Sequence, residues 1–445
     1  RTPTTLLHMT LIRRAPAFLA SLLIAAAIVA VAVLVLRATR DAPPAGIAEQ
    51  AAGDPHSASA TIERAQAVLA DHPDDAAALS ALAESSLVRL RETGDPSWLT
   101  RADEAARRAL AADPRRFAAM DALGSLSLTR HRFAEALDWS RRSLAVAPGR
   151  VAPIAIAADA QIELGRYDQG FAAVQRRMEL RPDLPSYSRA SYAAARRGDR
   201  GMAIRLMTLA AGAGAIGSPD RAFALVQVGL LRLGHGDLDG AEHEMRAALA
   251  ERPGDAPATA GLARVLAARG ELDRAAELYS RAIDLVPLPE YPAALADVHR
   301  ALGRPDLVRD DLALVEAMQR LLAANGSVVD LDAALIRADA RRATPADVAF
   351  ARRAWRSRPG VIGDQVLGWV LTRAGQCGEG NRYATRSLRL GTRDALMLFH
   401  AGMAAACAGD APAARQRLSS ALSLNPAFSV RWAPVARREL RRLGS

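Results

Sequence analysis

The chain has 445 residues, of which half are apolar and only 4% are aromatic. Alanine dominates, which favours closely spaced helices and argues against a β-sandwich. The formal net charge is +10, and all 58 basic residues are arginine. No recognised nucleic-acid motif accompanies this charge, so nucleic acid is not predicted as a partner.

After a short tail, residues 1–14, the chain has no charged residue from Ala15 to Leu36. About 20 apolar residues in a helix cross a bilayer, so residues 15–36 are predicted to be a transmembrane helix. The alternative is a cleaved signal peptide, which has a shorter apolar region followed by a small-x-small cleavage site. The match to that site, Ala30-Val31-Ala32, lies inside the apolar run, which favours an uncleaved anchor.

The charges around this segment predict its orientation. Arg13, Arg14 and the N-terminal amine precede it, whereas the two arginines that follow it have Asp41 beside them. The positive-inside tendency then places the N-terminus in the cytoplasm and the rest of the chain outside, at the periplasm or cell surface. Residues 37–58 contain prolines and glycines without apolar periodicity, which is typical of a flexible linker.

Prolines and turn residues recur with a fixed period beyond residue 73. The prolines are 34 residues apart within two series, Pro114, Pro148 and Pro182, and Pro219, Pro253 and Pro287. A glycine or polar turn recurs in phase, at His131, Gly165, Gly198, Gly236, Gly270, Gly303, Gly375 and Gly409. Each unit is therefore predicted to be a helix, a tight turn and a second helix that ends at the proline.

This unit resembles the tetratricopeptide repeat, in which small residues stand where the two helices cross. The unit that begins at Phe117 has the pair Leu123-Gly124, the small residue Ala136 and the closing Pro148. The last unit has Ala401-Gly402, Ala414, Ala421 and Pro426 in the same roles. The resemblance implies an all-α fold, a right-handed α-solenoid preceded by one transmembrane helix.

The predicted organisation has a leading helix in residues 59–73, about ten repeats in residues 74–426 and a capping helix in residues 427–445. The repeats depart from the pattern around Thr93–Ser97, in the fourth unit, which is lengthened by the stretch LAAGAGAIGSPD, and over residues 288–359. The closing sequence ARRELRRL is expected to present its charges to solvent, as a terminal cap does.

No catalytic, cofactor-binding or metal-binding constellation is found in the sequence, so no enzyme activity is predicted. His235 and His243 lie near acidic residues, but a surface turn and an exposed helix face explain them better than a metal site. The two cysteines, Cys377 and Cys407, fall at the start of one second helix and the end of the next first helix. These ends are neighbours in such a stack, so a disulfide is predicted in an oxidising compartment, with two buried thiols as the alternative.

In the family that the chain resembles, the first helix of each unit lines a concave groove. Carrying those positions over gives a candidate binding groove made of Tyr192, Arg196, Phe223, Val226, Leu230, Leu233, Trp369, Arg373, Phe399 and Met403. Apolar anchors with interspersed arginines suit an extended or helical peptide. The alternative is that these side chains pack against neighbouring first helices of a tight superhelix.

The sequence therefore predicts a membrane-anchored scaffold that binds protein or peptide partners, in envelope assembly or the biogenesis of protein complexes. It implies no cofactor and leaves the oligomeric state open. Two other functions remain open at this point. The chain would be an accessory or substrate-presenting subunit of an envelope enzyme, or a sensor that binds a small ligand between repeats.

Overall fold

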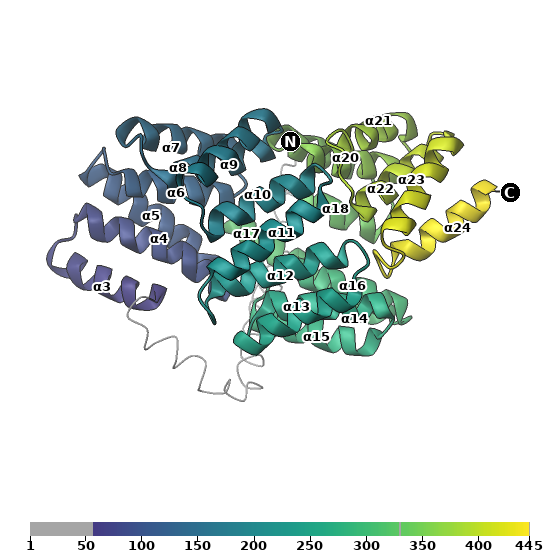
Figure 1. The fold of residues 1–445 in the computed structure, drawn as a ribbon, viewed down its shortest axis with the longest axis horizontal. Helices are drawn as coiled ribbons and strands as arrows, with labels where there is room; N and C mark the ends of the chain where they lie inside the picture. Colours follow the sequence, from purple (N-terminus) through teal and green to yellow (C-terminus); the bar gives the residue numbers. More distant parts are fainter. Residues whose placement is uncertain (1–56, 329–330, 445) are drawn as a thin grey trace, which may run out of the picture. The chain divides into compact units, whose positions relative to one another are not determined.

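The computed structural model describes residues 57–328 and 331–444, and every regular element in these ranges is a helix (Figure 1). The helices are α3 (Ala58–Asp71), α4 (Ala76–Thr93), α5 (Ser97–Ala112), α6 (Phe117–Thr129), α7 (Phe133–Val146), α8 (Val151–Glu163), α9 (Tyr167–Leu180), α10 (Leu184–Arg196), α11 (Arg200–Ala213), α12 (Pro219–Leu233), α13 (Leu238–Glu251), α14 (Ala256–Arg269), α15 (Leu272–Leu285), α16 (Glu290–Ala301), α17 (Pro305–Ala324), α18 (Leu331–Ala340), α19 (Pro345–Ser357), α20 (Val361–Arg373), α21 (Cys377–Ser387), α22 (Ala395–Cys407), α23 (Ala411–Leu424) and α24 (Trp432–Gly444). The predicted all-α solenoid of helical repeats is confirmed.

The helices from α4 to α23 form consecutive pairs, with α3 before the first pair and α24 after the last. Within each pair except α18 and α19, the chain reverses through a turn that contains a left-handed residue. Gly165 has φ 73° and Gly375 has φ 82°, values that glycine adopts without a steric penalty. His131 occupies the same turn position with φ 57°. The turn residues of the sequence pattern therefore mark the reversals between paired helices.

Close helix crossings explain the small residues of the pattern. Ala136, Ala275 and Ala414 are fully buried. At Gly402 an added Cβ would come within 2.7 Å of Leu418 Cγ, too close for any larger side chain. Small residues at these positions let the two helices of a pair approach each other, which buries the apolar faces that neither helix buries alone.

Units far apart in the sequence also meet. The Val361 amide donates to the Tyr167 hydroxyl over 2.6 Å, and the Asn425 side-chain amide donates to the Leu233 carbonyl over 2.8 Å. Glu163 forms a mostly buried ion pair with Arg358, with 2.5 Å between Oε2 and Nε. These partners are 192 to 195 residues apart. The solenoid therefore curves round until the turns of its earlier repeats contact those of its later repeats.

The repeats are interrupted between α17 and α18. Helix α17 has 20 residues and packs on α16, but it makes no comparable packing with α18. From α18 to α24 one continuous apolar core follows, which includes Trp369, Phe399 and Trp432. This break lies where the sequence pattern drifts, and it sets the last repeats apart as one well-packed stack.

Within the described residues, no helix is long and apolar enough to cross a membrane. The predicted transmembrane helix, residues 15–36, and the tail and most of the predicted linker around it lie outside the described residues. The predicted leading helix is observed as α3, which begins at Ala58.

A candidate binding groove on the last repeats

A groove with a volume of about 380 Å³ opens on the stack formed by α18 to α24. Its lining comes from the loop after α18, from α20 and the turn after it, and from α22 and α24. The lining residues are Arg342, Trp369, Thr372, Arg373, Gly375, Met403, Ala406, Cys407, Glu439 and Arg442. The volume falls in the range of sites that bind small ligands or a few side chains of a peptide.

Aromatic packing holds the floor of this groove rigid. Trp369 is only 2% exposed, and its indole N–H donates to the Asp339 carboxylate over 2.8 Å. The His400 ring stacks on Trp369 with a centroid distance of 4.3 Å, and the Trp432 ring meets its edge. Burial raises the pKa of Asp339 to about 6, although the indole hydrogen bond opposes this shift. The apolar floor is thus fixed before any partner arrives.

The walls carry more positive than negative charge. Three arginines, Arg342, Arg373 and Arg442, face one carboxylate, Glu439, which pairs with Arg442 over 2.6 Å. Burial lowers the pKa of Arg373, as do the charges of Arg431 and Arg342, while Asp339 opposes them. Its Nε donates to the Ala338 carbonyl over 3.0 Å. An apolar floor below guanidinium groups suits a segment with an apolar side chain and a neighbouring anionic group.

The predicted groove residues separate into two groups. Trp369, Arg373 and Met403 line the observed groove together. Val226, Leu233 and Phe399 are at most 3% exposed, and they pack inside the repeat stack. The structure therefore offers no surface of these three to a partner, because neighbouring first helices pack against each other, α12 on α14 and α20 on α22.

Four other predicted residues lie on α10 and α12, away from this groove. Tyr192 is 37% exposed and Phe223 is 49% exposed, while Arg196 and Leu230 are half-buried. The Tyr192 hydroxyl donates to Glu163 over 3.0 Å, and Arg196 donates to the same hydroxyl. Desolvation by its neighbours raises the pKa of Tyr192 to about 12. The cavity beside Tyr192 and Arg196 measures only about 10 Å³, which is space for little more than one water molecule.

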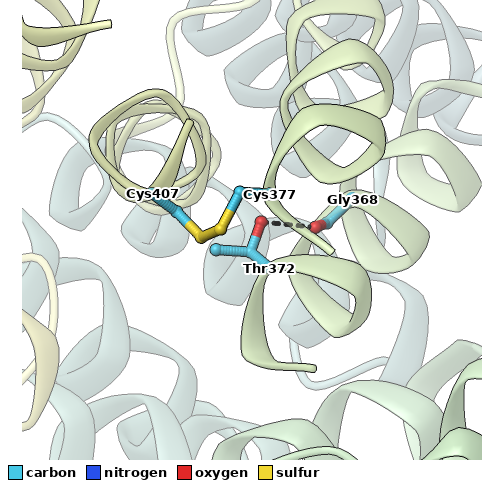
Figure 2. The surroundings of a disulfide bond; sticks show 4 residues. All are labelled: Gly368, Thr372, Cys377 and Cys407. Atoms are coloured by element: carbon cyan, nitrogen blue, oxygen red, sulfur yellow. Dashed lines mark hydrogen bonds between the residues drawn. A yellow bond between two sulfur atoms is a disulfide. The ribbon is translucent and has the colours of Figure 1, made fainter. Parts of the chain in front are cut away.

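The two cysteines are joined at one rim of the groove. Cys377 begins α21, Cys407 ends α22, and their Cα atoms are 5.2 Å apart in a disulfide (Figure 2). Thr372 lies beside the pair and donates its hydroxyl proton to the Gly368 carbonyl over 2.8 Å. Cys407 is exposed and lines the groove, and Cys377 is half-buried. The oxidation state of the protein in solution stays a prediction.

The sequence did not point to Arg342, Thr372, Glu439 and Arg442 as groove residues. Arg342 follows α18, in the region where the repeats drift. Glu439 and Arg442 belong to the closing helix, whose charges were expected to face solvent. The Arg442 side chain is 65% exposed, in agreement with this, and both residues also line the groove. A capping helix packs on the last repeat and therefore can line the same surface as the preceding first helix. This reasoning would have pointed to Glu439 and Arg442. Elsewhere, the described residues hold no group of three His, Cys, Asp or Glu side chains placed to bind a metal ion.

Comparison with known proteins identifies the repeat unit. A family model for the tetratricopeptide repeat matches residues 232–298, from the end of α12 to α16. No curated protein matches the chain significantly.

Several solved structures share the helical-repeat architecture. A tetratricopeptide repeat protein from Parabacteroides merdae is 16% identical, with 55% of this chain and 98% of that chain covered and a TM-score of 0.39. The human IFIT1 dimer with PPP-AAAA is 14% identical, with 81% and 89% covered and a TM-score of 0.43. PilW, a type IV pilus biogenesis factor, is 17% identical, with 44% and 91% covered and a TM-score of 0.37. None of these likenesses transfers an activity to this chain.

Proposed function

We propose that this chain, a tetratricopeptide repeat protein, is a membrane-anchored adaptor that holds a segment of a partner protein in the groove on its last repeats. The observation that carries the proposal is the groove itself, which combines an apolar floor with three arginines on its walls. The partner segment places an apolar side chain against Met403 and Ala406, the half-buried apolar residues of the lining, and an acidic group near Arg342. Binding without bond-making requires no cofactor, and no catalytic role is proposed for the repeats.

Membrane attachment is the second part of the proposal. The uncharged run from Ala15 to Leu36 would anchor the chain, and residues 37–58 would connect the anchor to the repeats. The charges around the run favour an extracytoplasmic location for the repeats. An adaptor in this position fits a role in envelope assembly or the biogenesis of protein complexes.

Reversing one charge on the groove wall tests the binding site. Arg342 is exposed, so Arg342→Glu is expected to leave the fold intact and to weaken partner capture about three- to tenfold, because an acidic segment is then repelled. Partners are first identified by crosslinking in native membranes and mass spectrometry, and affinity for the purified partner is then measured by calorimetry.

The matched control is Arg141→Glu on α7, where the arginine side chain is 63% exposed and lies outside the groove. It makes the same change in net charge and is expected to leave affinity unchanged. Equal affinity of both variants and the unaltered chain would exclude the groove as the binding site.

Deleting residues 15–36 tests the anchor. The unaltered chain is expected in the membrane fraction after an alkaline wash, because a spanning helix resists extraction, whereas the deletion variant is expected in the soluble fraction. Protease added to spheroplasts, whose periplasmic face is accessible, should digest the repeats. An unaltered chain that the alkaline wash extracts would contradict the anchor, and repeats protected from external protease would contradict the orientation.

A further inference from the structure

The chain has only two cysteines, and the fold brings them to the rim of the groove. They differ in their surroundings. Cys407 is exposed and faces the groove, whereas Cys377 is half-buried and is the first residue of α21 (Figure 2). A thiol that lies in the groove is therefore next to Cys407, whereas Cys377 does not belong to the lining.

We propose that the Cys377–Cys407 pair is a thiol–disulfide exchange site, which captures a thiol-bearing partner segment through a reversible bond to Cys407. The identification of the thiol as part of a bound protein segment rests on the proposed function. The exchange chemistry itself does not rest on it. Helix α21 already packs against α22, so the disulfide is not needed to hold these two helices together.

The exchange conserves atoms and electrons. The partner thiol loses its proton to water, and its thiolate attacks Cys407 Sγ. A partner–Cys407 disulfide forms as the Cys377–Cys407 bond breaks, and the electron pair leaves on Cys377 Sγ as a thiolate. In the reverse step this thiolate attacks Cys407 and releases the partner. The number of disulfides stays constant, so capture needs no further oxidant or reductant.

The helix ends favour this direction of attack. Cys377 stands at the N-terminus of α21, where the amide dipoles stabilise a negative charge, and its preceding residue supplies no side-chain cap. Cys407 stands at the C-terminus of α22, where the carbonyl dipoles disfavour one. Cys377 is thus the better leaving thiolate, and it belongs to the less exposed residue of the pair. Cys407, which lines the groove, is the poorer leaving group and the one that is attacked.

The positive wall adds selectivity for the incoming thiol. Arg342 lies against the turn before Cys377, since an added Cβ at Gly375 would come within 3.4 Å of its Nη2. Arg373 and Arg442 line the same groove. Anionic thiols are therefore expected to accumulate near Cys407 and to react faster than cationic thiols of similar reactivity.

Glutathione, an anionic thiol that needs no knowledge of the partner, is the probe. The oxidised full-length protein in detergent is exposed briefly to reduced glutathione and quenched with acid, and the adducts are located by peptide mapping. We expect an adduct on Cys407 in about tenfold excess over Cys377, because the leaving group and the access both favour it. Cysteamine, a cationic thiol, should react several-fold more slowly, and Arg342→Glu should reduce that difference.

Two single-cysteine variants complete the experiment. With glutathione disulfide, Cys377→Ser is expected to accumulate a stable adduct on Cys407, whereas Cys407→Ser should be modified slowly at the half-buried Cys377. An adduct mainly on Cys377 would overturn the proposal, as would an intact disulfide after prolonged exposure or two reduced thiols in the native protein. Because glutathione replaces the partner, these results do not depend on whether Arg342→Glu weakens partner capture.

Discussion

Replacing Asp364 with alanine is expected to lower the free energy of unfolding by about 3 kcal/mol, since it removes the anion from a buried ion-pair network. Asp364 has no exposed surface, although it is an acidic residue in the first turn of α20. Its carboxylate forms a bidentate pair with Arg386, accepts from Arg389, and accepts the Trp355 indole N–H over 2.9 Å. One side chain thus ties α19, α20 and the end of α21 together.

The size of the effect follows from what the substitution leaves behind. The side chains of Arg386 and Arg389 are 46% and 34% exposed, so water solvates them when the carboxylate is gone. The Trp355 N–H, however, loses a buried partner, and a cavity replaces the carboxylate. We therefore expect a cost at the lower end of the range for a broken buried pair. Asp364→Asn should cost less, because it keeps the shape of the side chain.

The loss is measured by thermal denaturation followed by circular dichroism, together with hydrogen exchange of the α20 and α21 amides. Asp138→Ala is the control, since Asp138 pairs with Arg141 while its side chain is 64% exposed, and such surface substitutions change stability little. If both alanine variants had the same melting temperature as the unaltered chain, the buried network would have no stabilising role.

The sequence predicted the repeats well because the signals for a repeat are local. A turn needs a residue tolerant of positive φ, such as Gly165, and a crossing needs a small residue, such as Ala136. Both requirements recur in most units, so their period is visible without any knowledge of the path of the solenoid. The same signals weaken before α18, where the packing between consecutive units is interrupted.

The groove was only partly predictable, because its shape depends on how sharply the solenoid curves. Periodicity identifies neighbouring units but not the contacts between Glu163 and Arg358, 195 residues apart. Phe399 is buried against Trp369, Phe428 and Trp432, and the repeat period does not specify these contacts. Arg342 lies outside any repeat pattern, so no sequence signal placed it on the wall.

The last repeats are expected to lose stability in acid through His400, by roughly 2–3 kcal/mol between pH 6.5 and pH 4.5. His400 is 1% exposed and stacks on Trp369, and burial lowers its pKa from 6.5 to about 3. Its Nδ1 lies 3.1 Å from the Gln365 amide nitrogen, which donates to it, while the buried Nε2 has no hydrogen-bond partner. The fold therefore accommodates the neutral ring and disfavours the cation.

The sign follows from proton uptake. Above pH 6.5 both folded and unfolded chains keep this histidine neutral, so its contribution is fully present. As the pH falls below 6.5 the unfolded chain binds a proton that the folded chain does not bind until about pH 3, and the free energy of unfolding decreases. Asp339 acts in the opposite direction. Its pKa is raised to about 6, so the folded chain takes up a proton between pH 6 and 3.8 before the unfolded chain does.

Because the two contributions oppose each other, the measurement is a difference between variants. Urea unfolding of the unaltered chain and of His400→Phe is compared at pH 7 and pH 4.5. The phenylalanine variant lacks the titrating ring but keeps an aromatic group against Trp369, so its stability should fall less over this interval, by roughly 2–3 kcal/mol. His72→Gln, which replaces an exposed histidine, should behave as the unaltered chain does. Parallel pH dependences for the unaltered chain and His400→Phe would show that the ring is protonated in the folded state without cost, and that the aromatic floor of the groove admits a charge.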